Sequence, residues 1–134
     1  MKHLIIVITL LCSGCAGFNP YEDMSKSEMV WQGLHLVDAL QTINIHDDPC
    51  YFETNPYMVD LVGIDAEPGK VAAWWLGKSF IHAAITREIE ESSLPNWFGT
   101  VWQAITIVDE VDSVYGNHDI GLRPYPASNR ECGL

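Results

Sequence analysis

The chain has 134 residues, 48% of them hydrophobic, and its 7 Lys and Arg against 18 Asp and Glu give a formal net charge of -11. This composition is typical of one small folded domain and excludes disordered, collagen-like and disulfide-dense chains. Nucleic-acid binding depends on clustered Lys and Arg, whereas those of this chain are scattered singly. We therefore expect no nucleic-acid partner.

The first 15 residues have the layout of a signal peptide, with a charged start, an apolar run from Leu4 to Leu11 and small residues before Cys15. The run is too short to span a bilayer, which needs about 20 apolar residues. The segment resembles the lipobox of bacterial lipoproteins, in which the signal is cut before a cysteine that carries lipid. The resemblance implies palmitate or another acyl chain on Cys15.

This lipoprotein resemblance also divides the chain and places it in the cell. It implies a signal peptide at 1–14, a lipidated tether at 15–26 and a helical domain at 27–134, with the membrane as partner through the Cys15 lipid. Ala16, where Asp would retain a lipoprotein in the inner membrane, favours the outer membrane, with the domain facing the periplasm. An ordinary secreted protein and an uncleaved anchor remain the alternatives.

Two cysteines are left unmodified once the signal is removed and Cys15 is lipidated. These are Cys50 and Cys132, and the compartment is oxidising, so we expect a disulfide between them. Two unpaired thiols are the alternative.

The pattern of the remaining sequence predicts an all-α fold: a small bundle of three main helices with a partly ordered connecting segment and an extended C-terminal tail. The first helix begins near Ser25 or Ser27, with Ser27 as its cap, and ends near Ile45 before a turn at 46–49. The second follows Pro68-Gly69 and runs to about Ser92. The third opens at 94–96 and ends at Gly116-Asn117. In the apolar connecting segment, a short helix from Pro56 to Val62 is expected.

Each predicted main helix has a narrow polar stripe and a wide apolar arc, the reverse of a usual surface helix. The stripes are Ser27, Trp31, His35, Asp38 and Thr42; Lys78, Ser79, His82 and Thr86; and Gln103, Thr106, Glu110, Ser113 and Asn117. Two packings fit this pattern. Either the stripes face water and the apolar arcs form the core, or the stripes converge on a polar pocket and the arcs face lipid, a partner or another protomer.

Six residues form a candidate polar cluster: His35, Asp38, Glu53, His82, Glu110 and Asn117. Imidazole and carboxylate groups from separate elements could form a divalent metal site or an acid and base pair. No spacing matches a metal signature such as His-Glu-x-x-His, so we assign no catalytic residue, metal or cofactor. Interhelical hydrogen bonding or solvent exposure is the structural alternative for Asp38 and His82.

A second resemblance covers the mature part of the chain, through Asp38-x-x-Gln41-Thr42, Glu53-x-Asn55-Pro56, His82, Glu110 and Asn117. This pattern is similar to small uncharacterised helical proteins of bacteria and their phages, and it implies an envelope protein but no reaction. We predict a lipid-anchored envelope protein that acts by binding or scaffolding, with an envelope protein as a further partner. The alternative is a metal-dependent hydrolase using Asp38, Glu53, His82 and Glu110.

Overall fold

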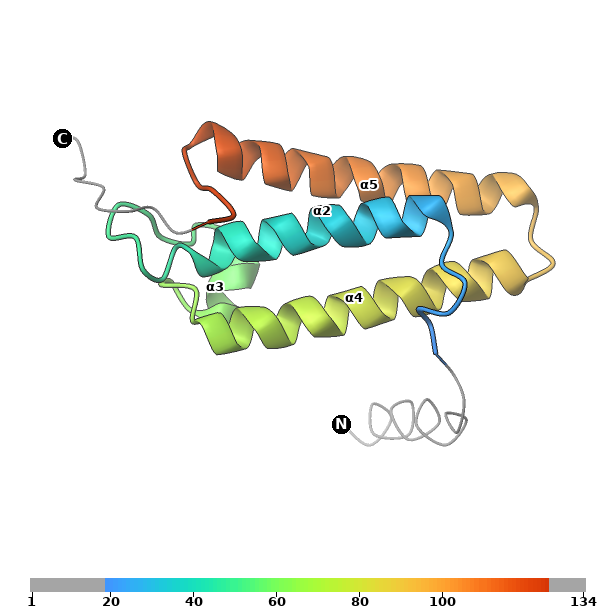
Figure 1. The fold of residues 1–134 in the computed structure, drawn as a ribbon, viewed down its shortest axis with the longest axis horizontal. Helices are drawn as coiled ribbons and strands as arrows, with labels where there is room; N and C mark the ends of the chain where they lie inside the picture. Colours follow the sequence, from blue (N-terminus) through green and yellow to red (C-terminus); the bar gives the residue numbers. More distant parts are fainter. Residues whose placement is uncertain (1–18, 126–134) are drawn as a thin grey trace.

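The computed structural model describes residues 19–125, which form four helices: α2 (Lys26–Ile43), α3 (Pro56–Val62), α4 (Pro68–Glu91) and α5 (Asn96–Asp119). Figure 1 shows the three long helices side by side, with α2 and α5 running in one direction and α4 in the other. Residues 19–125 contain no strand. The predicted all-α bundle is confirmed, and so is the short helix in the connecting segment.

Local signals account for the starts of the helices. The hydroxyl of Ser25 accepts a hydrogen bond from the backbone N–H of Glu28, so Ser25 caps α2 and the predicted cap at Ser27 is wrong. The Asn55 side chain caps α3 in the same way, and Pro56 follows it as the first helical residue. Each cap satisfies a backbone N–H that the helix itself leaves without a partner.

Helix α5 continues past its predicted end at Gly116-Asn117 to Asp119. A glycine inside a helix costs only about 1 kcal/mol, which tertiary contacts can offset. One such contact is made by Asn117, whose side-chain amide donates to Asp38 on α2 over 2.8 Å. The interhelical hydrogen bond therefore helps to hold the last turn that the sequence pattern left out.

Apolar packing is concentrated at one end of the bundle. Ile45, Val62, Ala66, Val71 and Leu122 form a buried cluster there, from the chain after α2, from α3, from the connection between α3 and α4, from α4 and from the chain after α5. This chain is also tied down by polar contacts: Asn44 donates to the carbonyl of Arg123 over 2.7 Å, and Tyr51 donates to that of Ile120 over 2.7 Å. The described start of the C-terminal tail thus packs against the end of α2.

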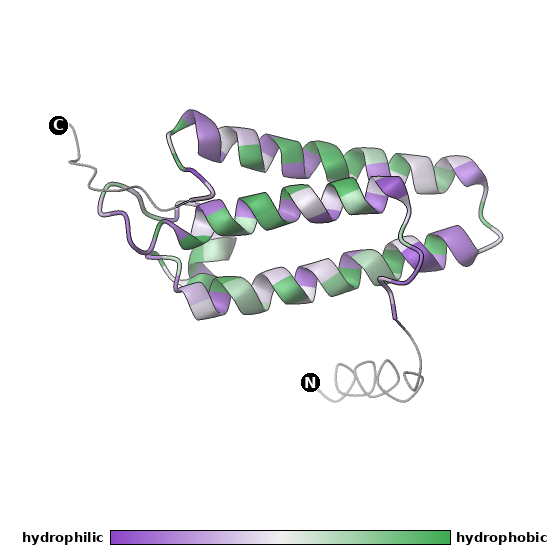
Figure 2. Cartoon of the chain, in the orientation of Figure 1, coloured by the Kyte–Doolittle hydropathy of each residue, from purple (hydrophilic) through white to green (hydrophobic). Residues whose placement is uncertain are grey.

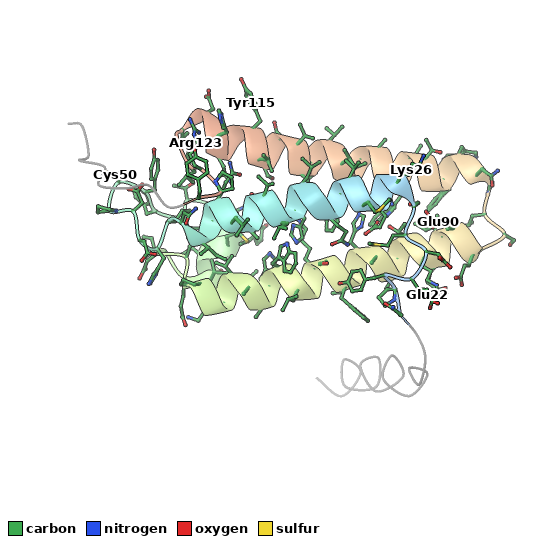
Figure 3. All side chains as sticks on the ribbon, viewed as in Figure 1. Glu22, Lys26, Cys50, Glu90, Tyr115 and Arg123 are labelled. Carbon is green, nitrogen blue, oxygen red and sulfur yellow. The ribbon has the colours of Figure 1, made fainter. Side chains whose placement is uncertain are left out.

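Figure 3 shows Cys50 at this same end, together with Arg123, whereas Lys26 and Glu90 lie toward the other end. Cys132 lies outside the described residues, as does the lipobox at Cys15. The Cys50–Cys132 disulfide and the Cys15 lipid therefore stay predictions.

Away from the apolar cluster, the helices meet mainly through polar side chains. Nine of these are at most 6% exposed: Glu28, His35, Gln41, Thr42, Ser79, His82, Thr86, Gln103 and Glu110. The polar stripes therefore converge inward, and the alternative packing, with the stripes facing water, is wrong. A buried polar group is stable only when it is hydrogen-bonded, so the contacts among these residues decide what the interior can do.

Large apolar side chains lie outside instead. Val30 on α2 is 52% exposed, Ile81 on α4 is 59% exposed, and Ile105 and Val108 on α5 are 65% and 66% exposed. Figure 2 shows hydrophobic residues interspersed with hydrophilic ones along the three long helices. Among residues 19–125, none of the helices combines the length and the apolar character needed to cross a membrane.

Candidate functional site

The interior of the bundle contains a column of five stacked rings, contributed by all three long helices. In order along the column these are Trp75, His35, Trp31, His82 and Trp102, with successive centroid distances of 6.1, 4.7, 3.6 and 5.1 Å. Trp31 and His82 are nearly parallel, with 3° between their planes, and Trp31 is 1% exposed. Because Trp31 stacks on both histidines, it separates the interior into two polar clusters.

The first cluster is centred on Glu28 of α2, and we call it the Glu28 cluster. The carboxylate accepts hydrogen bonds from Gln32 over 2.7 Å, from Thr86 over 2.8 Å and from Gln103 over 3.1 Å. Nδ1 of His82 lies 2.9 Å from the same carboxylate. The carboxylate is therefore contacted by side chains of all three long helices. An ionised carboxylate only accepts hydrogen bonds, so Nδ1 of His82 carries the donated proton.

Burial by itself raises the pKa of Glu28, but the hydrogen bonds from His82, Gln32, Gln103 and Thr86 outweigh it and lower the pKa from 4.5 to about 2. Glu28 is therefore ionised at neutral pH. With both oxygens occupied by donors, the Glu28 cluster is a closed network that crosslinks the three helices. Its geometry is that of a structural element, with no oxygen of Glu28 left to bind a ligand.

The second cluster is centred on Glu110 of α5, and we call it the Glu110 cluster. Nζ of Lys78 lies 2.5 Å from Glu110 Oε1, and Nδ1 of His35 lies 3.3 Å from the same oxygen. Asp38 is adjacent: one ligand-type atom from each of His35, Asp38 and Glu110 can be chosen so that all three lie within 4.8 Å of one another. One nitrogen and two carboxylate oxygens at this separation could hold a divalent metal ion.

The two carboxyl groups of the Glu110 cluster are perturbed in opposite directions. Burial raises the pKa of Glu110, but His35 and Lys78 outweigh it, so the pKa lies below its ordinary value. Asp38 has a pKa raised from 3.8 to about 6, first by burial and then by repulsion from Glu110. The part of this shift that comes from the negative charge of Glu110 would be offset by an added cation.

A partly open pocket of about 660 Å³ lies against the Glu110 cluster. Its walls come from α2, α4, α5 and the segment 53–61, and His35 and Asp38 line it. The other charged residues of the lining are Glu53, Asp109 and Lys78, so three carboxylates face one ammonium group. Because Lys78 is already paired with Glu110, the pocket favours positively charged ligands.

Several buried polar atoms near the pocket have no hydrogen-bond partner within the part of the chain that the structure describes. They include Nε2 of His35, Oε2 of Glu110 and the indole N–H of Trp75. His35 is 3% exposed and Glu110 is 1% exposed. Leaving such groups without a partner costs roughly 1 to 3 kcal/mol each, which a bound ligand or water would recover.

The structure divides the candidate polar cluster that was predicted from the sequence. His35, Asp38, Glu53 and Asn117 line the pocket, and Glu110 lies next to it through its contacts with His35 and Lys78. His82 does not belong to this group, because it pairs with Glu28 instead. The predicted hydrolase set of Asp38, Glu53, His82 and Glu110 is therefore not brought to one point. Interhelical hydrogen bonding, the structural alternative, is found for both Asp38 and His82.

The sequence prediction left out Glu28 as an interior residue, and it assigned neither the ion pair of Lys78 with Glu110 nor the stacking of Trp31 on His35 and His82. One signal in the sequence points to Glu28: Glu28, Trp31 and His35 are spaced by three and four residues, which places them along one face of a helix. The spacing cannot show that Glu28 pairs with His82, 54 residues further along the chain.

No protein-family model matches this chain, and no curated protein or solved structure shows significant similarity to it.

Proposed function

We propose that this protein is a lipid-anchored protein of the bacterial envelope that acts by binding a small cationic ligand in the pocket beside the Glu110 cluster. The observation that carries the proposal is the charge of the pocket: Asp38, Glu53 and Asp109 line it, and its one lysine is already paired. The net charge of -11 on the whole chain would also attract cations toward it.

The aromatic walls of the pocket support the same class of ligand. Tyr57, Trp74 and Trp75 line it, and the face of an aromatic ring attracts a cation by roughly 0.5 to 2 kcal/mol. The unpartnered indole N–H of Trp75 would add a hydrogen bond to an acceptor on the ligand. A small ammonium compound with an apolar stem and one acceptor atom matches these features.

The lipid anchor is the second part of the proposal, and it rests on the lipobox resemblance at Cys15. Three residues lie between Cys15 and Asn19, where the described structure begins, so these four Cα-to-Cα steps could span at most about 14 Å. Asn19 is held at one end of the bundle, where its carbonyl accepts from Arg87 over 2.6 Å. A lipid on Cys15 would place this end close to the bilayer surface.

The exposed apolar faces of the helices support a binding role that includes a protein or membrane partner. Monomeric soluble proteins rarely expose large continuous apolar patches, and such patches usually mark sites of interaction. The start of α5 lies toward the same end of the bundle as the start of the described chain (Figure 1), and Trp97 and Phe98 in this part of α5 are 62% and 41% exposed. Indole rings are favoured at the interface between membrane and water.

Metabolic labelling with palmitate tests the anchor. We expect label on the wild-type chain and on Cys12→Ala, which serves as the matched control, and no label on Cys15→Ala. Equal labelling of wild type and Cys15→Ala, or no labelling of either, would disprove the anchor.

Ligand-observed NMR on the full chain in detergent tests the pocket. Ethanolamine and putrescine are the cationic probes, and ethylene glycol is the uncharged counterpart. We expect binding of the ammonium compounds, weakened roughly tenfold by Asp38→Asn because one unit of negative charge is lost. Asp112→Asn, an exposed carboxylate on α5 outside the pocket, is the control and should bind as wild type does. Equal binding of charged and uncharged probes would refute the proposal.

The second candidate function is a metal-dependent hydrolase, and the juxtaposition of His35, Asp38 and Glu110 is the observation that favours it. In such an enzyme, a metal held beside the pocket would polarise the substrate or activate a water molecule. The test is hydrolysis of p-nitrophenyl phosphate and p-nitrophenyl acetate with added Zn²⁺ or Mn²⁺. This candidate predicts turnover that is lost in Asp38→Asn and kept in Asp112→Asn.

A further inference from the structure

We infer that His35, Asp38 and Glu110 form a binding site for a divalent transition-metal ion at the inner side of the pocket. This inference rests on the proposed cation-binding function and adds a metal ion at the inner side of the same pocket. It places the metal where the three helices meet, because His35 and Asp38 come from α2, Glu110 comes from α5, and Lys78 of α4 borders the site.

The first support is geometric. One potential ligand atom from each of the three residues lies within 4.8 Å of the other two. Ligand atoms around a zinc ion at about 2.0 to 2.2 Å stand roughly 3 to 4 Å apart, so a small inward movement of side chains would complete the coordination. The pocket beside them gives a metal ion a path from solvent and leaves space for water or a further ligand.

The second support is independent of the carboxylates. His35 is 3% exposed, yet Nε2 of its ring has no hydrogen-bond partner within residues 19–125, whereas Nδ1 faces Glu110 Oε1 at 3.3 Å. The ring is also held in place by stacking on Trp31 at 4.7 Å and on Trp75 at 6.1 Å. Oε2 of Glu110 is also buried and unpartnered in this part of the chain. A metal ion would satisfy both of these groups at once.

The donor set indicates which metals fit. One imidazole nitrogen with two carboxylate oxygens suits Zn²⁺, Mn²⁺ or Co²⁺, whereas Ca²⁺ prefers six or more oxygen ligands. Asn117 donates to Asp38 over 2.8 Å and would orient that carboxylate toward the metal. Such outer contacts to ligand side chains are a regular feature of metal sites.

Lys78 makes the inference sharply testable. Its ammonium group binds Glu110 and lies 5.7 Å from the centre of the Trp31 ring. It therefore neutralises part of the negative charge that would attract a metal ion. The Lys78 side chain is 36% exposed, which gives its ammonium group a route into solvent when a metal enters. Lys78 therefore competes with the metal, and its removal should strengthen metal binding.

The experiment is isothermal titration of the full chain in detergent with Zn²⁺, with Ca²⁺ as the comparison ion. We expect one zinc site, weakened at least roughly tenfold in His35→Gln and Asp38→Asn, and unchanged in the control Asp112→Asn. Lys78→Gln should tighten zinc roughly tenfold because one competing positive charge is lost. A misfolded variant cannot gain affinity in this way, so Lys78→Gln keeps the test valid even if the other variants fold poorly.

Spectroscopy on the Co²⁺ complex provides a readout that separates this site from adventitious thiol ligands. Nitrogen and oxygen ligation gives visible d–d bands without the intense near-ultraviolet thiolate transitions. Zinc affinity that is equal in wild type and Asp38→Asn, or that falls in Lys78→Gln, would overturn the inference. If ammonium probes bind and Zn²⁺ does not, the metal inference alone fails; if neither binds, the proposed cation pocket fails with it.

Discussion

Replacing Glu28 by glutamine tests whether the Glu28 cluster holds the bundle together. The substitution keeps the shape of the side chain but removes its charge, and it turns one acceptor oxygen into a donor. That donor would face the hydroxyl of Thr86 and the amide of Gln103, which both donate to Glu28 Oε2 in the wild-type protein. Donors that face each other in a buried site leave at least one group without a partner.

Two estimates of the cost agree. The pKa of Glu28 is lowered from 4.5 to about 2, and at about 1.4 kcal/mol per pH unit this gives about 3 kcal/mol in favour of the ionised form in the folded state. Leaving a buried hydrogen-bond donor without an acceptor independently costs roughly 1 to 3 kcal/mol. We therefore expect Glu28→Gln to lower the free energy of unfolding at pH 7 by about 3 kcal/mol.

The pH dependence of stability gives a second measurement of the same interaction. Because the folded-state pKa is lower than the unfolded one, the stabilisation is present above about pH 4.5 and is lost as the pH falls toward 2. Urea unfolding followed by circular dichroism should show this loss in the wild type, and Glu28→Gln should lack that part of it. Glu90→Gln, an exposed residue of α4, is the control and should unfold as wild type does.

The reasoning would be refuted by a cost below about 1 kcal/mol for Glu28→Gln at pH 7, since surface substitutions alone produce changes of about 0.5 kcal/mol. Parallel loss of stability in wild type and variant between pH 4.5 and 2 would refute it as well. Either result would mean that the bonds to His82, Thr86, Gln32 and Gln103 are replaced by water at little cost.

Three further predictions concern the stacked column, the Glu110 cluster and the tail. Trp31→Ala should lower the free energy of unfolding, measured in urea, by roughly 3 to 5 kcal/mol. Trp97 is 62% exposed, so Trp97→Ala should lower it by less than about 1 kcal/mol. Similar losses in the two variants would contradict the buried column. Asp38 has a folded-state pKa of about 6 against an ordinary 3.8, so its ionisation destabilises the fold as the pH rises from 4 through 6. The free energy of unfolding of Asp38→Asn should therefore exceed that of wild type by roughly 1 to 2 kcal/mol at pH 7 and equal it at pH 4. A difference that does not depend on pH would show that the ionisation of Asp38 is not its cause. Unfolding the mature protein without reductant and counting thiols should detect no free Cys50 or Cys132, and two reactive thiols would show that the disulfide is absent.

The helices themselves are local features, and the sequence alone was enough to predict them. Asn55 caps α3, and Pro56 and Pro68 each stand first in a helix because the fixed backbone angle of proline suits that position, so these signals act over only a few residues. For this reason α3 was predicted with its correct ends. The predicted end of α5 at Gly116-Asn117 was too early because the hydrogen bond from Asn117 to Asp38 joins residues 79 positions apart.

The direction of the polar stripes was decided only by the tertiary structure. The same spacing of Trp31, His35 and Asp38 fits a stripe toward water or toward the interior, because helical periodicity says which residues share a face and not what that face meets. The inward packing becomes stable when each buried group finds its partner on another helix, as Glu28 does with His82 and Glu110 does with Lys78. Those partners lie 54 and 32 residues away along the chain. Pairing at such separations depends on how the helices pack in space, which no local pattern records.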